Sequence, residues 1–206
     1  KSEHVQHGMK TGYTLGIWHQ LLPEVSMQPE TIEVQALARL TDIAVSLHSP
    51  IRTTAVGIGV LLHRTDTKKR NRILDRWDIH KREGLNLRQI VCDGIHQALK
   101  LIEDCNTSTI RSSSESGELG VALGIARCIQ PSPALEVAVE YATNLGIMHS
   151  PLLPLLQGRD LLALGVPAGE YIGTLLNRIR AAQLDGRINT FDDAMKLARQ
   201  LIANET

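Results

Sequence analysis

Apolar residues recur at helical spacing along almost the whole chain, while the alternating pattern of a half-buried strand is nearly absent. Residues 84–104 show this best, and their apolar positions on one helical face are Leu87, Ile90, Val91, Ile95, Ala98, Leu101 and Ile102. Aromatic residues make up only 3% of the sequence, so the core must be aliphatic. Such a core favours helices packed on helices over a β-sandwich. We therefore expect an all-α fold of about nine to ten helices.

Glycine and proline indicate where these helices begin and end. We expect one helix over residues 12–22, which stops at Pro23, and a second that starts at Pro29, because proline is favoured in the first helical turn. Residues 53–63 are apolar on almost every side, which predicts a buried central helix. Residues 1–105 are therefore expected to form a helical body.

Two later segments interrupt the helical pattern. Residues 106–118 are rich in Ser, Thr and Asn, which predicts a solvated connection with at most a short helix. Residues 148–158 contain two prolines and should be mostly extended. We expect connecting helices within residues 106–150 and a separate small helical unit, the tail, in residues 151–206.

The tail gives the clearest signals for helix ends. A short helix over residues 159–164 should end at Gly165, and Pro167 should start the next helix. Thr190 and Asp193 have the spacing of a capping box, which predicts the start of a last helix. The tail is therefore expected to contain three helices.

Composition excludes some classes of protein. Lys plus Arg and Asp plus Glu both number 22, so no overall field attracts the chain to nucleic acid or to a membrane. No apolar run is long enough to span a bilayer. Cys92, Cys105 and Cys128 lack metal-binding spacing and are expected to be buried free thiols in a cytoplasmic protein. Because the sequence begins at Lys1, we expect a piece of a longer protein.

The motif LLHRTD, residues 61–66, is a candidate for metal chemistry. Metal-dependent HD phosphohydrolases present a His-Asp pair at the end of an apolar helix, but here Arg64 replaces the aspartate and would repel a metal ion. We expect His63 to interact with the last carbonyl groups of its own helix instead. Nucleophile-elbow, Walker A, zincin and CxxC motifs are absent from the sequence. We therefore predict no catalytic or metal-binding residue on this chain.

Charge is distributed unevenly in one place. Residues 64–88, the basic segment, contain nine Lys or Arg residues against four Asp or Glu residues, a surplus of five positive charges. Such a surplus suits a phosphate backbone, because each neutralised phosphate releases a counterion. The alternative is a solvated helix face, which is what most charge runs form. The charges alone favour neither interpretation.

Residues 153–199 carry a dense pattern of glycine and leucine positions. The pattern consists of Leu156, Gly158, Asp160, Leu161, Leu164, Gly165, Gly169, Ile172, Gly173, Leu176, Ala182, Gln183, Leu184, Gly186, Ala194 and Ala198. It resembles the C-terminal tail of bacterial class II tRNA nucleotidyltransferases, the CCA-adding enzymes and the related poly(A) polymerases. Weaker similarity to the helical body of that family extends through GIWHQLLPEV, AVGIGVLLH and LDRWDIHKREGLNLRQIV. The family's first HD histidine would fall near Gln35, so the HD-like region is expected to be degenerate.

The resemblance implies a function and its limits. Members of the family have a catalytic head, a neck that selects the nucleotide, and a helical body and tail that hold the tRNA. The G-S and D-x-D motifs of the head and the EDxxR motif of the neck are absent from this sequence. The head, with its Mg²⁺ and its ATP or CTP, is therefore expected outside this chain. The implied partners are tRNA or another RNA and the protein's own N-terminal catalytic head, with no membrane and no cofactor on this chain.

Two regions are expected to contact RNA. The basic segment would supply cations to phosphates, and the tail would supply Arg159 and the turn over residues 165–173, where a helix N-terminus can accept an anion. Gly169 and Gly173 leave room for close approach, either by RNA or by a neighbouring helix. The expected RNA-binding residues are Lys68, Lys69, Arg70, Arg72, Lys81, Arg82, Arg159, Gly165 and Gly169.

Two other functions stay open from the sequence. One is an HD-like metal-dependent phosphohydrolase that uses His63, and bound metal with phosphatase activity would support it. The other is a helical scaffold that binds only protein, which the neutral net charge mildly favours. The sequence also leaves open whether the parent enzyme adds CCA, part of it, or a poly(A) tail.

Overall fold

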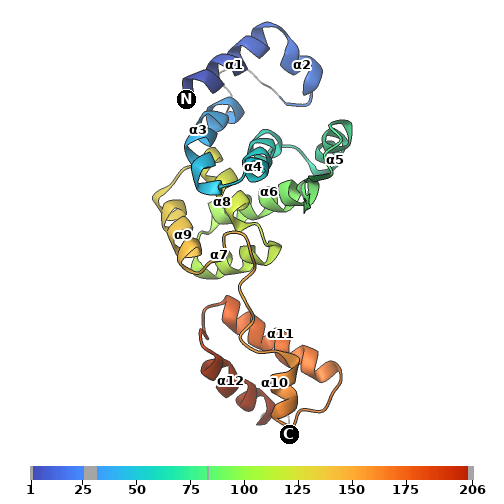
Figure 1. The fold of residues 1–206 in the computed structure, drawn as a ribbon, viewed down its shortest axis with the longest axis vertical. Helices are drawn as coiled ribbons and strands as arrows, with labels where there is room; N and C mark the ends of the chain where they lie inside the picture. The colour runs from blue at the N-terminus through green and yellow to red at the C-terminus, as the bar shows by residue number, and fades with distance from the viewer. Residues whose placement is uncertain (1, 26–31, 83, 204–206) are drawn as a thin grey trace.

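The computed structural model describes residues 2–25, 32–82 and 84–203, and it confirms an all-α protein (Figure 1). These residues form twelve α-helices, which exceeds the expected nine to ten, together with a 3-10 helix and a two-stranded hairpin. The first elements are α1 (Ser2–Thr14), α2 (Ile17–Leu21), α3 (Ile32–Leu47), α4 (Pro50–Leu62), α5 (Thr67–Arg76), β1 (Lys81–Arg82), β2 (Leu85–Asn86) and α6 (Leu87–Glu103). The later elements are α7 (Thr107–Ser113), η1 (Ser114–Ser116), α8 (Leu119–Ile129), α9 (Pro133–Asn144), α10 (Gly158–Ala163), α11 (Glu170–Leu184) and α12 (Phe191–Ala203).

Helix α8 is the centre of a large aliphatic core. Its residues 119–126 are all buried, and it packs against α3, α4 and α6. This packing needs small residues at the crossings, since a Cβ atom at Gly59 of α4 would lie only 2.3 Å from the side chain of Ile125. Helices α7 and α9 also contribute side chains to this core. The body and the connecting helices therefore share one core.

The N-terminal segment departs from the expected single helix over residues 12–22. Two helices form instead, because Gly16 adopts a left-handed conformation with φ of 68° between them. The indole ring of Trp18 then packs over Gly12, where a Cβ atom would lie 2.4 Å from the ring nitrogen. Pro29, the expected start of the next helix, lies outside the described residues.

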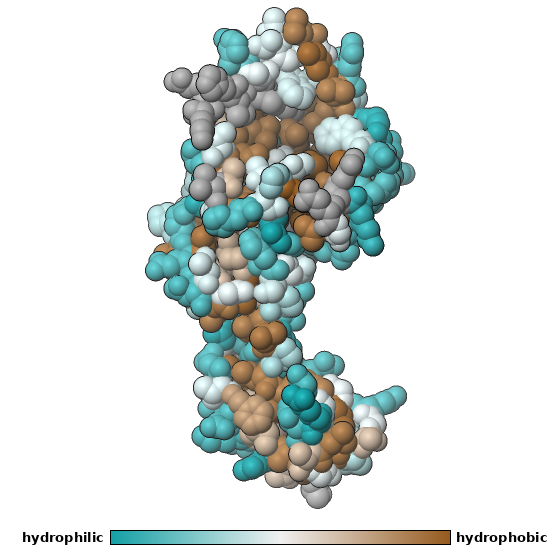
Figure 2. Space-filling view, viewed as in Figure 1, coloured by the Kyte–Doolittle hydropathy of each residue, from teal (hydrophilic) through white to brown (hydrophobic). Residues whose placement is uncertain are grey.

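Apolar side chains reach the surface where α1 and α2 meet. The exposed fractions are 45% for Tyr13, 66% for Leu15, 42% for Ile17 and 51% for Leu21. Figure 2 shows brown apolar atoms at this end of the molecule, which lies opposite the tail. No helix within the described ranges is long and apolar enough to cross a lipid bilayer.

A short hairpin precedes α6, so this helix starts at Leu87 and not near residue 84 as expected. The two strands are antiparallel, and the paired residues are Lys81 with Asn86 and Arg82 with Leu85. The side chain of Asn86 caps α6, since its Oδ1 atom accepts a hydrogen bond of 3.2 Å from the main-chain N–H of Gln89. The hairpin thereby places the end of the basic segment against the start of α6.

The tail has an aliphatic core of its own. Its most buried members are Leu161, Leu175, Ile179, Ala182, Ala194 and Ala198. The expected helix start at Pro167 is wrong: α11 begins at Glu170, because the chain first turns to bury Val166 in this core. The predicted cap of the last helix is confirmed, since the hydroxyl oxygen of Thr190 accepts a hydrogen bond of 3.2 Å from the main-chain N–H of Asp193.

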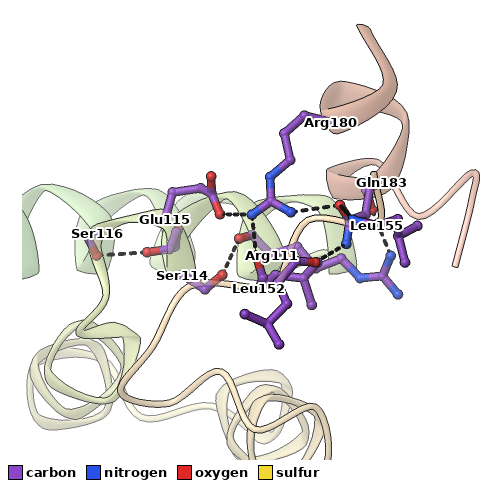
Figure 3. Close-up of polar contacts among 10 residues, drawn as sticks. Arg111, Ser114, Glu115, Ser116, Leu152, Leu155, Arg180 and Gln183 are labelled. Carbon is purple, nitrogen blue, oxygen red and sulfur yellow. Dashed lines mark hydrogen bonds and ion pairs between the residues drawn. The ribbon is translucent and has the colours of Figure 1, made fainter. Parts of the chain in front are cut away.

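Residues 145–157, which we call the strap, join α9 to the tail. They contain no helix, as the two prolines in this segment predicted. Polar side chains hold the strap and α7 against α11, and we call this group the clasp (Figure 3). The clasp consists of Arg111, Glu115, Arg180 and Gln183. Arg180 donates hydrogen bonds to the carboxylate of Glu115 and to the carbonyl oxygen of Leu152 in the strap. The two cores are thus joined through polar contacts.

Candidate RNA-binding surface

Helix α5 carries four of the expected RNA-binding residues. Asp66 caps it, since its carboxylate accepts a hydrogen bond of 2.8 Å from the main-chain N–H of Lys69, and this bond holds the pKa of Asp66 below its ordinary value. Ile73 and Leu74 are completely buried in the body core, which fixes the rotation of the helix about its axis. The basic residues on its exposed side are Lys68, Lys69, Arg72 and Arg76.

Four basic side chains of the segment are paired with carboxylates. The pairs are Lys69 with Asp66 at 3.7 Å, Arg76 with Glu24 at 2.8 Å, Arg64 with Glu33 at 3.9 Å, and Arg88 with Asp75. The hydrogen bonds from Arg76 lower the pKa of Glu24 to about 2. Because Glu24 and Glu33 lie outside residues 64–88, neighbouring elements neutralise part of the surplus charge.

Arg70 turns toward the protein. It is half-buried and donates a hydrogen bond of 2.9 Å from Nη2 to the carbonyl oxygen of Thr65. Its Nε atom is buried and has no hydrogen-bond partner within the described residues. The guanidinium group also acts electrostatically on the thiol of Cys92, in α6. Arg70 therefore connects the start of α5 to α6, and only part of its charge faces solvent.

Three basic side chains of the segment are exposed and make no ion pair with any residue that the structure describes. They are Lys68, Arg72 and Lys81, which we call the basic ridge. Lys68 and Arg72 are four residues apart on α5 and so share one face of the helix. Arg72 contributes only a weak electrostatic effect on Glu24. Arg82 lies in β1, but its side chain is outside the described part of the structure.

The expected contacts in the tail lie around an open turn. Arg159 is 79% exposed, and its Nε atom is 3.9 Å from the carboxylate of Asp160. Gly165 has a φ of 85°, which ends α10 in the left-handed region that favours glycine. Cβ atoms added at Gly165, Gly169 or Gly173 would meet nothing within 4 Å. Packing of a neighbouring helix therefore does not explain these glycines, and the space over the turn is accessible.

The two expected RNA-binding regions do not come together. Helix α5 lies beside α6 in the upper unit of Figure 1, whereas α10 and the turn before α11 belong to the lower unit, the tail. They are two separate candidate contacts on one elongated molecule.

The HD-like motif forms structural contacts. His63 follows α4, and its Nδ1 atom lies 2.7 Å from the carbonyl oxygen of Val60, which confirms the interaction with helix-end carbonyl groups. Arg64 pairs with the buried carboxylate of Glu33 on α3. Among the described residues, no group of three or more His, Cys, Asp or Glu side chains is placed to hold a metal ion.

Gln183 has a structural role in the clasp that was not predicted from the sequence. This side chain is only 4% exposed, and its Nε2 atom donates a hydrogen bond of 2.7 Å to the carbonyl oxygen of Leu153. Its Oε1 atom accepts hydrogen bonds from Arg180 at 2.7 Å and from the main-chain N–H of Leu155 at 3.4 Å. Gln183 belongs to the A-Q-L part of the tail pattern, which marked this position in the sequence. A single sequence does not indicate which groups the side chain bonds to.

A second missed group lies where the strap meets the body. Arg52, in α4, donates two hydrogen bonds to the carboxylate of Glu118, with distances of 2.8 and 2.9 Å. The Nδ1 atom of His149, in the strap, lies 3.4 Å from the same carboxylate. These residues come from positions far apart in the sequence, so no local motif indicates them.

Comparisons with known proteins found no match. No protein-family model, no curated protein and no solved structure matches this chain significantly. The resemblance to tRNA nucleotidyltransferases therefore rests on the sequence pattern alone.

Proposed function

We propose that this chain is the RNA-holding part of a template-independent nucleotidyltransferase that adds nucleotides, CCA or a poly(A) tail, to RNA 3′ ends. On this proposal the catalytic head, which would bind Mg²⁺ and ATP or CTP, lies outside residues 1–206. The chain itself holds tRNA or another RNA in the cytoplasm and performs no nucleotidyl transfer alone. The proposal is supported by the tail pattern and by the charges of the body.

The main support for the proposal is the exposure of the basic ridge. Lys68, Arg72 and Lys81 are exposed and unpaired within the described residues, although the whole chain has no net charge. Exposed cations without a partner on their own chain are the groups that neutralise phosphates and release counterions. A tRNA acceptor arm is a duplex, which proteins recognise largely through its shape and its phosphates. The ridge fits this mode of binding.

The placement of the basic ridge and the tail contacts on different units suits the same partner, an RNA duplex. The molecule is elongated, with α5 on the upper unit and α10, the helix that contains Arg159, on the lower unit (Figure 1). A rod-shaped RNA duplex can contact both units at once, whereas a compact small ligand cannot. The clasp, which fixes the strap against α11, would then hold the two contacts at a set spacing.

The test is tRNA binding by a charge-reversed ridge. We expect the variant Lys68→Glu, Arg72→Glu, Lys81→Glu to bind tRNA more weakly at low salt than the wild-type protein. The slope of log affinity against log salt should flatten by roughly 0.9 for each lost phosphate contact. A fluorescence titration at several salt concentrations measures both quantities.

A matched control changes the same charge elsewhere. Lys10, Lys100 and Lys196 are exposed lysines on three other helices, and reversing all three gives the same net charge as the ridge variant. This control should keep most of the affinity and the slope. Equal losses in both variants would mean that binding follows net charge alone, and unchanged binding in the ridge variant would refute the proposal.

A second candidate function, a protein-binding scaffold, is favoured by the exposed apolar side chains of the α1–α2 surface. Leu15 and Leu21 are 66% and 51% exposed there. Replacing both with Glu should leave tRNA binding unchanged if the RNA proposal is right. Chromatography of the wild-type and variant proteins would show a change in association state if this surface binds another chain.

A further inference from the structure

A concave pocket of about 280 Å³ lies between the hairpin, the first half of α6 and the residues that follow η1. Leu85 and Ile90 supply apolar surface to its lining, and Gly94 and Gly117 keep other parts of the lining free of side chains. Asn86, Gln89 and Asp93 contribute polar groups. Apolar surface together with a few hydrogen-bonding groups is typical of pockets that bind small molecules.

Asp93 is the carboxylate of this pocket that makes no pair with another described residue. Its side chain is half-buried, and within the described residues it makes no hydrogen bond and no ion pair. The other carboxylate of the lining, Glu118, is held by two hydrogen bonds from Arg52 at 2.8 and 2.9 Å. A partly buried carboxylate without a donor is costly, and its two oxygens can accept a pair of N–H groups from a ligand.

The pocket is also joined to the basic ridge. Lys81 lies opposite Asn86 in the hairpin, and residues directly opposite in an antiparallel ladder project from the same face. The Oδ1 atom of Asn86 accepts from the main-chain N–H of Gln89, so its amide N–H groups are available to a ligand. The exposed ammonium group of Lys81 thus belongs to the same face of the hairpin as Asn86, which lines the pocket.

We propose that this pocket binds a guanine base of the RNA, with a phosphate of the same nucleotide on Lys81. The inference rests on the proposed function, because it deepens the RNA contact made by the ridge. Guanine presents two neighbouring donors, N1–H and N2–H, that match the two oxygens of Asp93. Adenine and cytosine place an acceptor nitrogen beside their amino group, and uracil places carbonyl groups on both sides of its N–H. The oxygens of Asp93 would therefore repel an acceptor atom on the edge of each of these bases. Unpaired bases of RNA are recognised along these edges.

Nucleoside monophosphates test the pocket directly. In ¹⁵N-labelled protein, guanosine 5′-monophosphate should shift the amide signals of Gly84, Asn86 and Gly117. Its affinity should exceed that of inosine 5′-monophosphate, which lacks the N2 amino group, and of adenosine 5′-monophosphate by roughly tenfold. The variant Lys81→Gln should weaken binding of the monophosphate but leave binding of guanosine unchanged.

The variant Asp93→Asn removes the proposed acceptor pair and should abolish the preference for guanine. Its control is Glu103→Gln, which removes the same charge from an exposed position about 15 Å further along α6. Unchanged circular dichroism and melting temperature would verify that both variants fold. Equal affinities of the wild-type protein for the three monophosphates would overturn the inference, and so would an unchanged preference in Asp93→Asn.

Oligouridine strands that carry one guanosine or one inosine connect the pocket to RNA. The wild-type protein should prefer the guanosine strand, and Asp93→Asn should not, while both keep the same salt dependence. Preference for the free monophosphate without preference for the guanosine strand would overturn RNA as the source of the base. Failure of the proposed function is seen separately, as the loss of any difference between the ridge variant and its lysine control.

Discussion

The guanidinium group of Arg111, on α7, donates a hydrogen bond of 2.9 Å to the main-chain carbonyl oxygen of Gln183, on α11. The Nε atom of Arg111 also donates to the hydroxyl oxygen of Tyr141, on α9, at 2.7 Å, and the guanidinium group lies 5.8 Å from the centre of that ring. One side chain therefore joins the tail to two of the connecting helices. Since the aliphatic cores are separate, such polar contacts set the orientation of the tail.

Replacing Arg111 with Leu should loosen the tail without unfolding it. The carbonyl oxygen of Gln183 would keep only the main-chain N–H of Gly186, and the hydroxyl group of Tyr141 would lose its partner, at a cost of about 1–3 kcal/mol. Small-angle scattering should then report a broader distribution of shapes, while circular dichroism keeps its helical signal. Arg187→Leu is the control, because Arg187 is 62% exposed and pairs with Asp185 in the same turn, which follows α11. Identical scattering of both variants would show that Arg111 does not orient the tail.

Replacing Gln183 with Leu should destabilise the tail strongly. Leu cannot donate to the carbonyl oxygen of Leu153 or accept from Arg180, so these part-buried polar groups would lose a hydrogen bond. We expect a loss of about 2–3 kcal/mol in the free energy of unfolding, measured with urea. The exposed Gln200, on α12, provides the control, and its replacement by Leu should change stability by less than about 0.5 kcal/mol. Equal effects of the two changes would contradict the role assigned to Gln183.

The sequence predicted those helices whose aliphatic stripe runs over several turns. Helix α6 was predicted in this way, because burial of a continuous stripe outweighs weak local preferences. Helix α12 was located by its cap, the pair Thr190 and Asp193. The hairpin before α6 escaped prediction because each strand has two residues, too few to show alternation. The break at Gly16 was missed because glycine within an apolar pattern allows either a helix or a left-handed turn.

The candidate site was predictable only as a region. The surplus of positive charge identified residues 64–88 as a candidate site, but it did not indicate which of the basic side chains lack an ion-pair partner. Arg70 and Arg72 lie two residues apart on α5, yet Arg70 bonds to the carbonyl oxygen of Thr65 while Arg72 is exposed. The carboxylates that compensate other members of the segment, such as Glu24, are distant in the sequence. Only the fold brings these partners together.

The three cysteines should differ in their reaction with a thiol reagent. Cys128 is completely buried, and burial raises the pKa of its thiol to about 12. At pH 8 its thiolate fraction is then about one part in ten thousand. The expected burial is wrong for Cys92 and Cys105, which are half-buried and should react in the native protein, whereas Cys128 should react only in denaturant. Mass spectrometry of the labelled peptides measures this order, and early labelling of Cys128 would contradict the packing of α8.

The ion pair between Glu24 and Arg76 should make stability depend on pH. Hydrogen bonds from Arg76 lower the pKa of Glu24 from 4.5 to about 2, so the folded state favours the charged carboxylate. Such a group stabilises the fold above the pKa of the unfolded chain, and the stabilisation is lost as the pH falls from about 4.5 toward 2. The Glu24 and Arg76 side chains are 25% and 42% exposed, so solvent screening limits the contribution to about 1 kcal/mol.

The variant Glu24→Gln should therefore unfold with a free energy about 1 kcal/mol lower than the wild-type protein at pH 7. The difference should shrink below pH 4.5 and vanish only below pH 2, where the carboxyl group of Glu24 binds its proton in both the folded and the unfolded wild-type protein. Urea titrations across this range measure it. Glu103→Gln, which removes an exposed carboxylate that has no ion pair within the described residues, should give no such pH dependence. A constant difference between Glu24→Gln and the wild-type protein at all pH values would mean that the pair with Arg76 does not hold in solution.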